Sequence, residues 1–417
     1  MKNEQNAPKI RFKGFTDAWE LRELGDIVGI YDGVHQTPNY QNSGIMFLSV
    51  ENIATLKSSK FISEEDFKRD YKVYPQENDI LMTRIGDVGT TNVVTDNGLK
   101  AYYVSLALLK YKGTDPYFLS NAIQSDYVQK GLANRTLKTA IPMKINKDEI
   151  GKVSVMLPLS ATEQQQIGTY FRTLDHLITL HQRKCETLQK LKKSMLQKMF
   201  PKNGSCFPEI RFAGFTDAWE QRELGECMET VTDYVAAGSF ADIAENVQYK
   251  TFPDFAQLIR TVDLKHEFKN NDYIYVDKKA FDYLWKVNLN VECIILPNIG
   301  ANIGEVYYIE PSSLPYENNV LGPNAIFLKA KDSTKFMYTL LQADDFQNKL
   351  YVSIASSGQP KFNKTELKAI KILIPNSAEQ EKIGAYFRTL DHLITLHQRK
   401  LETLKKLKKA MLQKMFI

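Results

Sequence analysis

Residues 163–200 read EQQQIGTYFRTLDHLITLHQRKCETLQKLKKSMLQKMF, and residues 379–416 read EQEKIGAYFRTLDHLITLHQRKLETLKKLKKAMLQKMF. These two stretches differ at 6 of 38 positions. A shorter repeat precedes each of them, PKIRFKGFTDAWELRELG at 8–25 and PEIRFAGFTDAWEQRELG at 208–225, with 3 differences in 18. We call each shorter repeat a head. The inserts that separate each head from the following long repeat, about 26–162 and 226–378, share only scattered similarity. The chain therefore contains a duplicated frame, made of the two heads and the two long repeats, and two dissimilar inserts.

Each 38-residue repeat has the pattern of a long coiled-coil helix. Residues 160–163 and 377–380 fit the S-x-x-E/Q capping box, which predicts a helix start at each. Apolar positions then recur at alternating spacings of four and three, as in a coiled-coil seam. The predicted seam residues are Leu174, Ile178, His181, Cys185 and Leu188, and Leu390, Ile394, His397, Leu401 and Leu404. We expect the two histidines to pack in the seam rather than to bind a metal.

The repeat predicts an α+β protein with pseudo-two-fold internal symmetry. Two globular domains of mixed helices and strands, each large enough to bury its own core, are expected at 1–162 and 202–378. Two long helices, at 163–201 and 379–417, separate them and form an antiparallel coiled coil.

Cysteine use and hydropathy indicate an intracellular setting. Cys185, Cys206, Cys227 and Cys293 lack the spacing of a metal site, and Leu401 stands in place of Cys185 in the second copy. The chain begins with a polar stretch rather than a signal peptide, and no apolar run approaches the roughly 20 residues that span a bilayer. We expect a cytoplasmic protein with reduced thiols, no metal and no membrane contact.

The net charge of +5 is unevenly distributed. Residues 163–200 contribute +4 and residues 379–416 contribute +5, so the rest of the chain carries −4. Basic charge concentrated on the repeated helices favours a polyanion or an acidic partner nearby, although a solvated helix face gives the same pattern. The inserts, acidic on balance, need locally placed Lys and Arg to bind nucleic acid.

Two loop patterns recur in the inserts. A loop with two glycines, flanked by predicted strands, lies at 84–90 and again at 298–304. A polar loop that leads into a predicted strand lies at 136–146 and at 353–363, shortly before each repeated helix. Glycine lets backbone approach a ligand, and the polar side chains suit contacts with phosphates or base edges. Ordinary hairpins and surface loops have the same pattern.

Catalytic motifs are missing from the sequence. No two prolines are adjacent, so the Asp/Asn-Pro-Pro-aromatic motif of amino-methyltransferases is absent. The stretch at 115–118, Asp-Pro-Tyr-Phe, lacks the second proline and is predicted to open a helix. There is no phosphate-binding G-x-x-x-x-G-K-[ST] loop, nucleophile elbow or metal-dependent nuclease carboxylate set. The sequence therefore predicts a protein with no catalytic residues.

Over essentially its whole length the chain resembles the specificity (S) subunit of type I restriction-modification systems. The resemblance rests on the duplicated PxIRFxGFTDAWExRELG heads and on the duplicated helix starts that run into LDHLITLHQRK and LKKxMLQKMF. The GVHQTP stretch at 33–38 is similar to the family's Gly-x-Thr-Pro segment. The second insert departs from that pattern, with YVAAGSF at 234–240.

The resemblance implies a non-catalytic reader of DNA. Each insert would be a target recognition domain for one half of a split sequence in double-stranded DNA, and the paired helices would set the unread gap. The subunit would recruit two methyltransferase (M) subunits, which carry S-adenosylmethionine. Restriction (R) subunits, which use ATP and Mg, would join through the M subunits. No cofactor is expected on this chain.

Candidate DNA contacts follow from the loops and the resemblance. In the first half they are Gln36, Thr37, Asn39, Tyr40, Arg84, Arg135, Lys138 and Lys144. In the second half they are Tyr234, Ser239, Lys265, Asn298, Asn302, Ser356, Gln359 and Lys361. The rival interpretation is a tandem-repeat coiled-coil scaffold that binds only proteins and has no DNA specificity.

Overall fold

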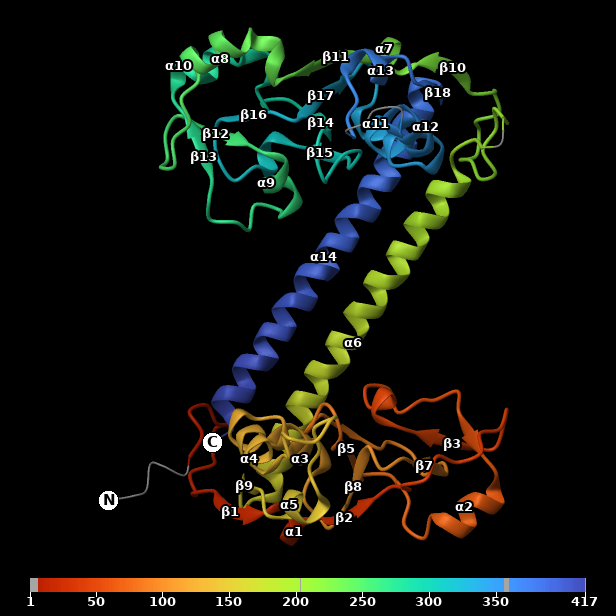
Figure 1. Ribbon diagram of the computed structural model, residues 1–417, viewed down its shortest axis with the longest axis vertical. Helices are drawn as coiled ribbons and strands as arrows, with labels where there is room; N and C mark the ends of the chain where they lie inside the picture. Colours follow the sequence, from red (N-terminus) through yellow and green to blue (C-terminus); the bar gives the residue numbers. More distant parts are fainter. Residues whose placement is uncertain (1–6, 203, 356–359, 417) are drawn as a thin grey trace. The chain divides into compact units, whose positions relative to one another are not determined.

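The computed structural model describes residues 7–202, 204–355 and 360–416, and it divides the chain into two compact units (Figure 1). The first unit is Met1–Arg183 with His397–Ile417, and the second is Lys184–Leu396. Each unit therefore holds one head and one insert, together with the start of one long helix and the end of the other.

The first unit contains the following elements in chain order. They are β1 (Glu20–Glu23), α1 (Leu24–Ile27), β2 (Gly29–Asp32), β3 (Ile45–Leu48), η2 (Val50–Asn52), β4 (Phe61–Ile62), α2 (Glu64–Asp70), β5 (Ile80–Thr83), β6 (Thr91–Val93), β7 (Lys100–Tyr102), β8 (Leu106–Lys110), α3 (Pro116–Ile123), α4 (Asp126–Arg135), α5 (Lys147–Gly151), β9 (Ser154–Leu157) and the first part of α6 (Ala161–Lys198). Asp115 caps α3 by accepting a hydrogen bond from the Phe118 amide, so the predicted helix start is confirmed.

The second unit follows the same order with additional short helices. Its elements are β10 (Glu220–Glu223), α7 (Leu224–Cys227), β11 (Met228–Asp233), η3 (Tyr234–Ala237), α8 (Phe240–Asn246), β12 (Ala256–Ile259), α9 (Thr261–Lys265), β13 (Ile274–Val276), α10 (Lys278–Tyr283), η4 (Trp285–Val287), β14 (Cys293–Pro297), β15 (Tyr307–Ile309), η5 (Pro311–Ser313), β16 (Asn319–Leu321), β17 (Ala325–Ala330), α11 (Thr334–Leu341), α12 (Asp344–Ala355), α13 (Lys364–Lys368), β18 (Lys371–Ile374) and α14 (Ser377–Met415).

Sheet topology is the same in both units. The first unit has a four-stranded antiparallel sheet in the order β2-β8-β5-β6, and the second has β11-β17-β14-β15. Beside it lies a three-stranded sheet, β4-β3-β7 or β13-β12-β16, in which one pair of strands is parallel. A two-stranded sheet joins each head to the strand before the long helix, as β1-β9 and β10-β18. The α+β class and the internal repeat are confirmed.

The central strands show why the inserts fold alike although their sequences differ. The first four residues of β8, LALL, are all buried, and β17 is buried at five of its six positions. A strand buried on both faces needs a continuous apolar run rather than an alternating one. Since any large aliphatic residue meets that need, the two inserts satisfy it with different sequences.

The long helices run antiparallel within each unit. In the first unit Asp175 of α6 pairs with Lys408 of α14 at 2.6 Å, and His181 Nδ1 lies 2.8 Å from His397 Nδ1. In the second unit Lys192 pairs with Asp391 at 2.6 Å. Every predicted seam residue is buried or half-buried. The two predicted seam histidines therefore meet each other.

One predicted helix cap is wrong by one residue. The amide of Glu379 donates to Asn376 Oδ1 at 3.0 Å, so Asn376 rather than Ser377 caps α14. The reciprocal side-chain bond of each predicted capping box is replaced by another contact: the carboxylate of Glu163 binds Arg11, and the Gln380 side chain donates to the carbonyl of Pro375 at 3.0 Å. In α6 the Ser160 hydroxyl does accept from the Glu163 amide, at 3.4 Å.

A buried ion pair ties each head to the start of its helix. Arg11 binds both carboxylate oxygens of Glu163 at 2.6 and 2.8 Å, and Arg211 binds Glu379 at 2.7 and 2.7 Å. The two glutamates are 1% and 0% exposed. Bidentate geometry of this kind compensates the removal of the carboxylate from water.

An aromatic cluster closes each unit around the end of the other repeat's helix. Phe416, next to the end of α14, packs in the first unit with ring centroids 5.5 to 6.3 Å from its neighbours, which are Trp19, Phe118 and Phe171. Phe200, at the end of α6, packs in the second unit at 5.7 to 6.1 Å, against Trp219, Phe336 and Phe387. Each repeat therefore completes the core of both units.

Candidate nucleic-acid interface

In the first unit a polar segment lies over a surface hollow. Gln36, Thr37 and Asn39 are exposed and border a cavity of about 570 Å³ between residues 34–39 and α2. Tyr40, 45% exposed, packs edge-on against Phe47. The structure thus leaves the amide, hydroxyl and phenol groups of the predicted contacts open to solvent. Their contact with DNA stays a prediction.

Arg84 is buried, unlike the other predicted contacts of the first unit. It is 5% exposed and forms an ion pair with Asp32 at the end of β2. Its Nε donates to the carbonyl of Ile145 at 3.0 Å, and its own carbonyl accepts from the Ile145 amide at 3.0 Å. Arg84 therefore fixes the root of the loop that precedes α5. We expect it to act on DNA only through that loop.

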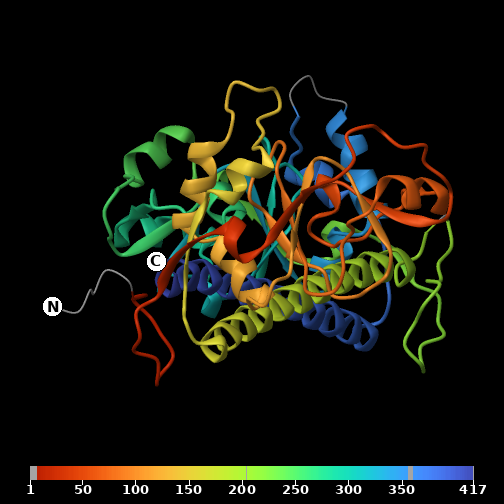
Figure 2. The same cartoon turned by 90° about the horizontal axis from the view of Figure 1, so that it is seen from below.

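That loop carries the remaining candidates of the first unit. Lys138 and Lys144 are exposed. Arg135, at the end of α4, forms a half-exposed ion pair with Glu149 at 3.2 Å. Figure 2 shows the golden loop between α4 and α5 standing out from the body of the first unit. The three basic residues thus lie on or next to one protruding segment, and their contact with DNA stays a prediction.

The second unit repeats this loop root with different chemistry. Asn298 occupies the place of Arg84: its Nδ2 donates to the carbonyl of Phe362 at 3.0 Å, and its carbonyl accepts from the Phe362 amide at 3.3 Å. Asp233, at the end of β11, pairs with Lys364 at 2.7 Å. Lys361 is exposed beside this root. Ser356 and Gln359 lie outside the described residues.

Two other candidates in the second unit have structural partners. Tyr234 is 6% exposed and accepts a hydrogen bond from the Tyr249 hydroxyl at 3.1 Å, and burial raises the pKa of Tyr234. Ser239 caps α8, with its hydroxyl bonded to Asp242. Asn302 is half-buried in the loop between β14 and β15. We expect Tyr234 to support the surface from beneath.

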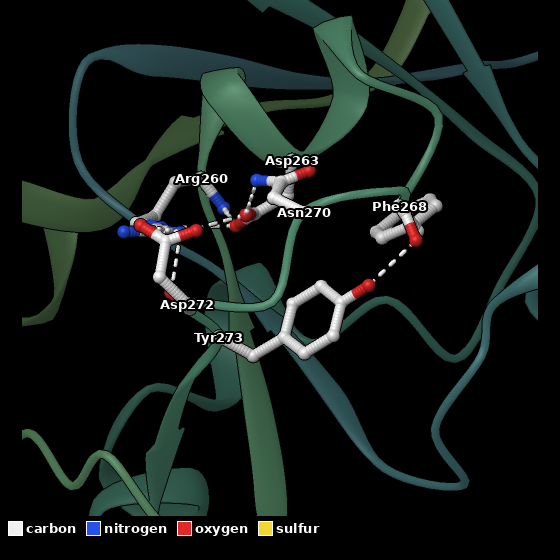
Figure 3. Close-up of polar contacts among 6 residues, drawn as sticks. All are labelled: Arg260, Asp263, Phe268, Asn270, Asp272 and Tyr273. Carbon is white, nitrogen blue, oxygen red and sulfur yellow. Dashed lines mark hydrogen bonds and ion pairs between the residues drawn. The ribbon is translucent and has the colours of Figure 1, made fainter.

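Lys265 ends α9 next to a loop held by a buried carboxylate. Lys265 itself pairs with Glu305. Asp263, 0% exposed, accepts from Arg260 Nη2 at 2.8 Å and from Asn270 Nδ2 at 3.0 Å. Figure 3 shows these contacts converging on one carboxylate and draws the six residues that shape the loop: Arg260, Asp263, Phe268, Asn270, Asp272 and Tyr273. The loop is therefore shaped from within by its own polar contacts.

The glycine loops have a shared anchor that the sequence did not reveal. Gln129 Nε2 donates to the Gly89 carbonyl at 3.1 Å, and Gln347 Nε2 donates to the Gly304 carbonyl at 3.1 Å. Both glycines have positive φ, 99° and 81°, which favours glycine. The glutamines lie about 40 residues from these loops along the chain. Gln129 and Gln347 hold the same position within α4 and α12, so an alignment of the two inserts could have revealed this anchor.

Comparison with known families accounts for this duplicated arrangement. The model of the type I restriction modification DNA specificity domain matches residues 16–190 and again residues 217–406. The chain belongs to this family. The two matches cover the second part of each head, both inserts and most of both long helices, so the resemblance noted from the sequence is confirmed over most of the chain. The specificity subunit is the non-catalytic component of such a system, as the missing motifs indicated.

Specificity subunits of other organisms align with this chain over nearly its full length. The type I restriction enzyme MjaVIII specificity subunit of Methanocaldococcus jannaschii is 23% identical, with 98% of this chain and 94% of the relative covered. The crystal structure of the S subunit of a type I restriction-modification system from M. genitalium has a TM-score of 0.66 and 16% identity, with 99% of each chain covered. The second likeness shows that the fold is shared.

No group of three or more His, Cys, Asp or Glu residues in the described part of the chain could hold a metal ion. Among the same residues, no helix is long and apolar enough to cross a membrane.

Proposed function

We propose that each unit of this specificity subunit reads one half of a split DNA sequence, and that α6 and α14 set the number of unread base pairs between the halves. One observation carries the proposal: the contacts that build the frame are duplicated residue by residue, whereas the exposed loops differ. Arg84 and Asn298 hold equivalent loops that present unlike side chains. Such a design suits two readers of different sequences.

The repeated surface supports docking of two copies of one partner. Leu180 and Leu396 are equivalent in the two helices and are 38% and 37% exposed. Leu191 and Leu407 are also equivalent, at 36% and 37%. Large apolar residues kept at the same exposed places in both copies suit contact with the same protein twice. We assign this contact to two M subunits, through which R subunits join.

The cofactors of the assembly belong to the partners in this proposal. S-adenosylmethionine is carried by the M subunits, and ATP and Mg are used by the R subunits. The specificity subunit contributes the choice of site: lysine and arginine side chains neutralise phosphates, and a few loop side chains read base edges in the major groove.

The test is co-expression with the cognate M subunit, followed by genome-wide mapping of N6-methyladenine. We expect a split motif that disappears when this chain is omitted. Absence of any motif dependent on this chain would contradict the proposal and favour the protein-binding scaffold.

The gap can be tested separately from the readers. Removing one seven-residue repeat from both α6 and α14 keeps the seam in register. It shortens each helix by about 10 Å, or about three base pairs of B-DNA. We expect the same two half-sites with a shorter gap, or loss of methylation. An unchanged gap would exclude the helices as the spacer.

A further inference from the structure

The protruding loop of the first unit has an apolar tip. Ile141 is 100% exposed, and Leu137 and Met143 are each 45% exposed. Single exposed aliphatic residues are common on protein surfaces. Here three of them lie within seven residues of a loop that stands out from its unit (Figure 2): Ile141 is fully exposed, and Leu137 and Met143, whose backbone groups close the base of the loop, are partly covered.

The root of this loop is fixed although its tip is exposed. The Leu137 amide donates to the Lys144 carbonyl at 2.8 Å and closes the loop at its base. The Gly86 amide donates to the Met143 carbonyl at 2.8 Å, and Arg84 holds the next residue from below. Because hydrogen bonds fix the base of the loop, little conformational entropy is lost when Ile141 inserts into a partner.

Lysines flank Ile141 along the chain. Lys138, Lys144 and Lys147 are exposed and form no ion pair with any described residue. Exposed acids also lie close to the loop: Asp87, whose carboxylate accepts from the Thr90 hydroxyl, follows Gly86, and Asp148 follows Lys147. An apolar projection ringed by free lysines is complementary to stacked bases bordered by phosphates.

We propose that Ile141 is a wedge that enters the base stack of the half-site bound by the first unit and unstacks one base step there. The flanking lysines hold the phosphates on either side of the opened step. Isoleucine, methionine and proline are among the residues that proteins use in this way to kink DNA. The inference rests on the proposed DNA-reading function and adds a deformation of the DNA to it.

The wedge belongs to one half of the molecule only. At the matching place the second insert has SSGQPK, residues 356–361, which contains no large aliphatic side chain. Part of this segment lies outside the described residues, so the contrast is one of sequence. We expect unstacking in the first half-site and none from the matching loop in the second.

The experiment uses the complex of this chain with its M subunit and duplexes that carry the mapped motif. 2-Aminopurine, whose fluorescence rises when it is unstacked, is placed at successive positions of each half-site other than the methylated adenine. We expect one position in the first half-site to brighten on binding. Ile141→Ala abolishes the rise and weakens binding about tenfold, the size expected for one aliphatic side chain.

Two further variants make the result specific. Leu99→Ala removes a side chain that is 45% exposed on the same unit, before β7, and leaves both signals unchanged. Ile141→Phe restores the fluorescence rise, because a larger apolar group also separates bases. Thermal unfolding shows that each variant is folded, as expected for surface positions.

The outcomes separate the wedge from the proposed function. A split motif together with wild-type fluorescence and affinity for Ile141→Ala would overturn the wedge and leave the function intact. Loss of M-subunit binding by Ile141→Ala, measured by size-exclusion chromatography, would also overturn it and make the tip a protein contact. Absence of any motif dependent on this chain would overturn both.

Discussion

The two units of the specificity subunit hold equivalent loops with different side chains. In the first unit a buried arginine, Arg84, binds the root of the loop before α5, with Asp32 as its counter-ion. In the second unit a half-buried asparagine, Asn298, binds the root of the loop before α13, and the equivalent aspartate pairs with Lys364. The same backbone geometry is reached with different chemistry.

The difference shows which contacts a repeated frame must keep. The Arg–Glu pairs and the aromatic clusters are identical in type in the two units, because they join heads and helices. Loop roots vary because any donor that reaches one carbonyl is sufficient. The loops beyond the roots are free to diverge, as the proposal of two readers of unlike sequences on one partner-binding frame requires.

The largest expected effect tests whether the two aromatic clusters are equivalent. Phe416→Ala and Phe200→Ala each remove a buried ring that comes from the other repeat's helix. We expect each to lower the free energy of unfolding of its own unit by about 3–5 kcal/mol. Urea unfolding followed by tryptophan fluorescence measures this. Phe207→Ala, at a site 54% exposed, is the control and changes little. A large loss of unfolding free energy for only one of the two variants would show that the two clusters are not equivalent.

The ion pairs between head and helix come next. Arg11→Met and Arg211→Met each leave a buried glutamate without its partner. We expect a loss of about 3 kcal/mol for each variant. Arg22→Met removes a half-exposed pair with Glu20 and should cost under about 0.5 kcal/mol. Equal losses for Arg11→Met and Arg22→Met, measured by urea unfolding, would mean that burial does not decide the strength of these pairs.

The loop roots should respond unequally to alanine. Arg84→Ala leaves Asp32 without its counter-ion and should cost about 2 kcal/mol, whereas Asn298→Ala removes one neutral hydrogen bond and should cost about 1 kcal/mol. Each variant should also slow methylation at the split motif. Urea unfolding and methylation rates of the complex measure both effects. A wild-type methylation rate for the complex with Arg84→Ala would show that the loop does not need Arg84 to hold its conformation.

The smallest expected effect concerns a single phosphate contact. Lys138→Gln should lower the slope of log affinity against log salt by about one and weaken binding a few-fold. Lys152→Gln, where the lysine pairs with Glu149 at 2.6 Å, is the matched control and should leave the slope unchanged. Titrations of the complex with labelled duplex at several salt concentrations decide between them. An unchanged slope for Lys138→Gln would remove it from the interface.

The sequence predicted the frame well because its signals are local or repeated. Seam spacing located α6 and α14, and the duplication implied their antiparallel pairing. The exposed lysines of the first unit, Lys138 and Lys144, lie in the stretch 136–146 that the sequence predicted as a polar loop. Single-residue patterns misplaced the cap of α14, where Asn376 competes with the adjacent Ser377.

Buried polar roles were harder to predict. Arg84 and Tyr234 have the residue types of DNA contacts, but both side chains point inward because partners distant in sequence bind them. The pair of Asp32 with Arg84 spans 52 positions, and no spacing rule links such residues. Long-range contacts of this kind depend on how strands cross in the fold, which residue periodicity does not specify.

The most direct test of the central claim replaces the second insert by the first, so that residues 26–160 stand in place of 226–376 and Ser160 takes the capping place of Asn376. The frame contacts are common to both halves, and the variant should still assemble with the M subunit. Mapping of N6-methyladenine should then reveal a motif made of the first half-site twice. Persistence of the original second half-site would contradict the account, as would a complex that assembles but methylates no motif.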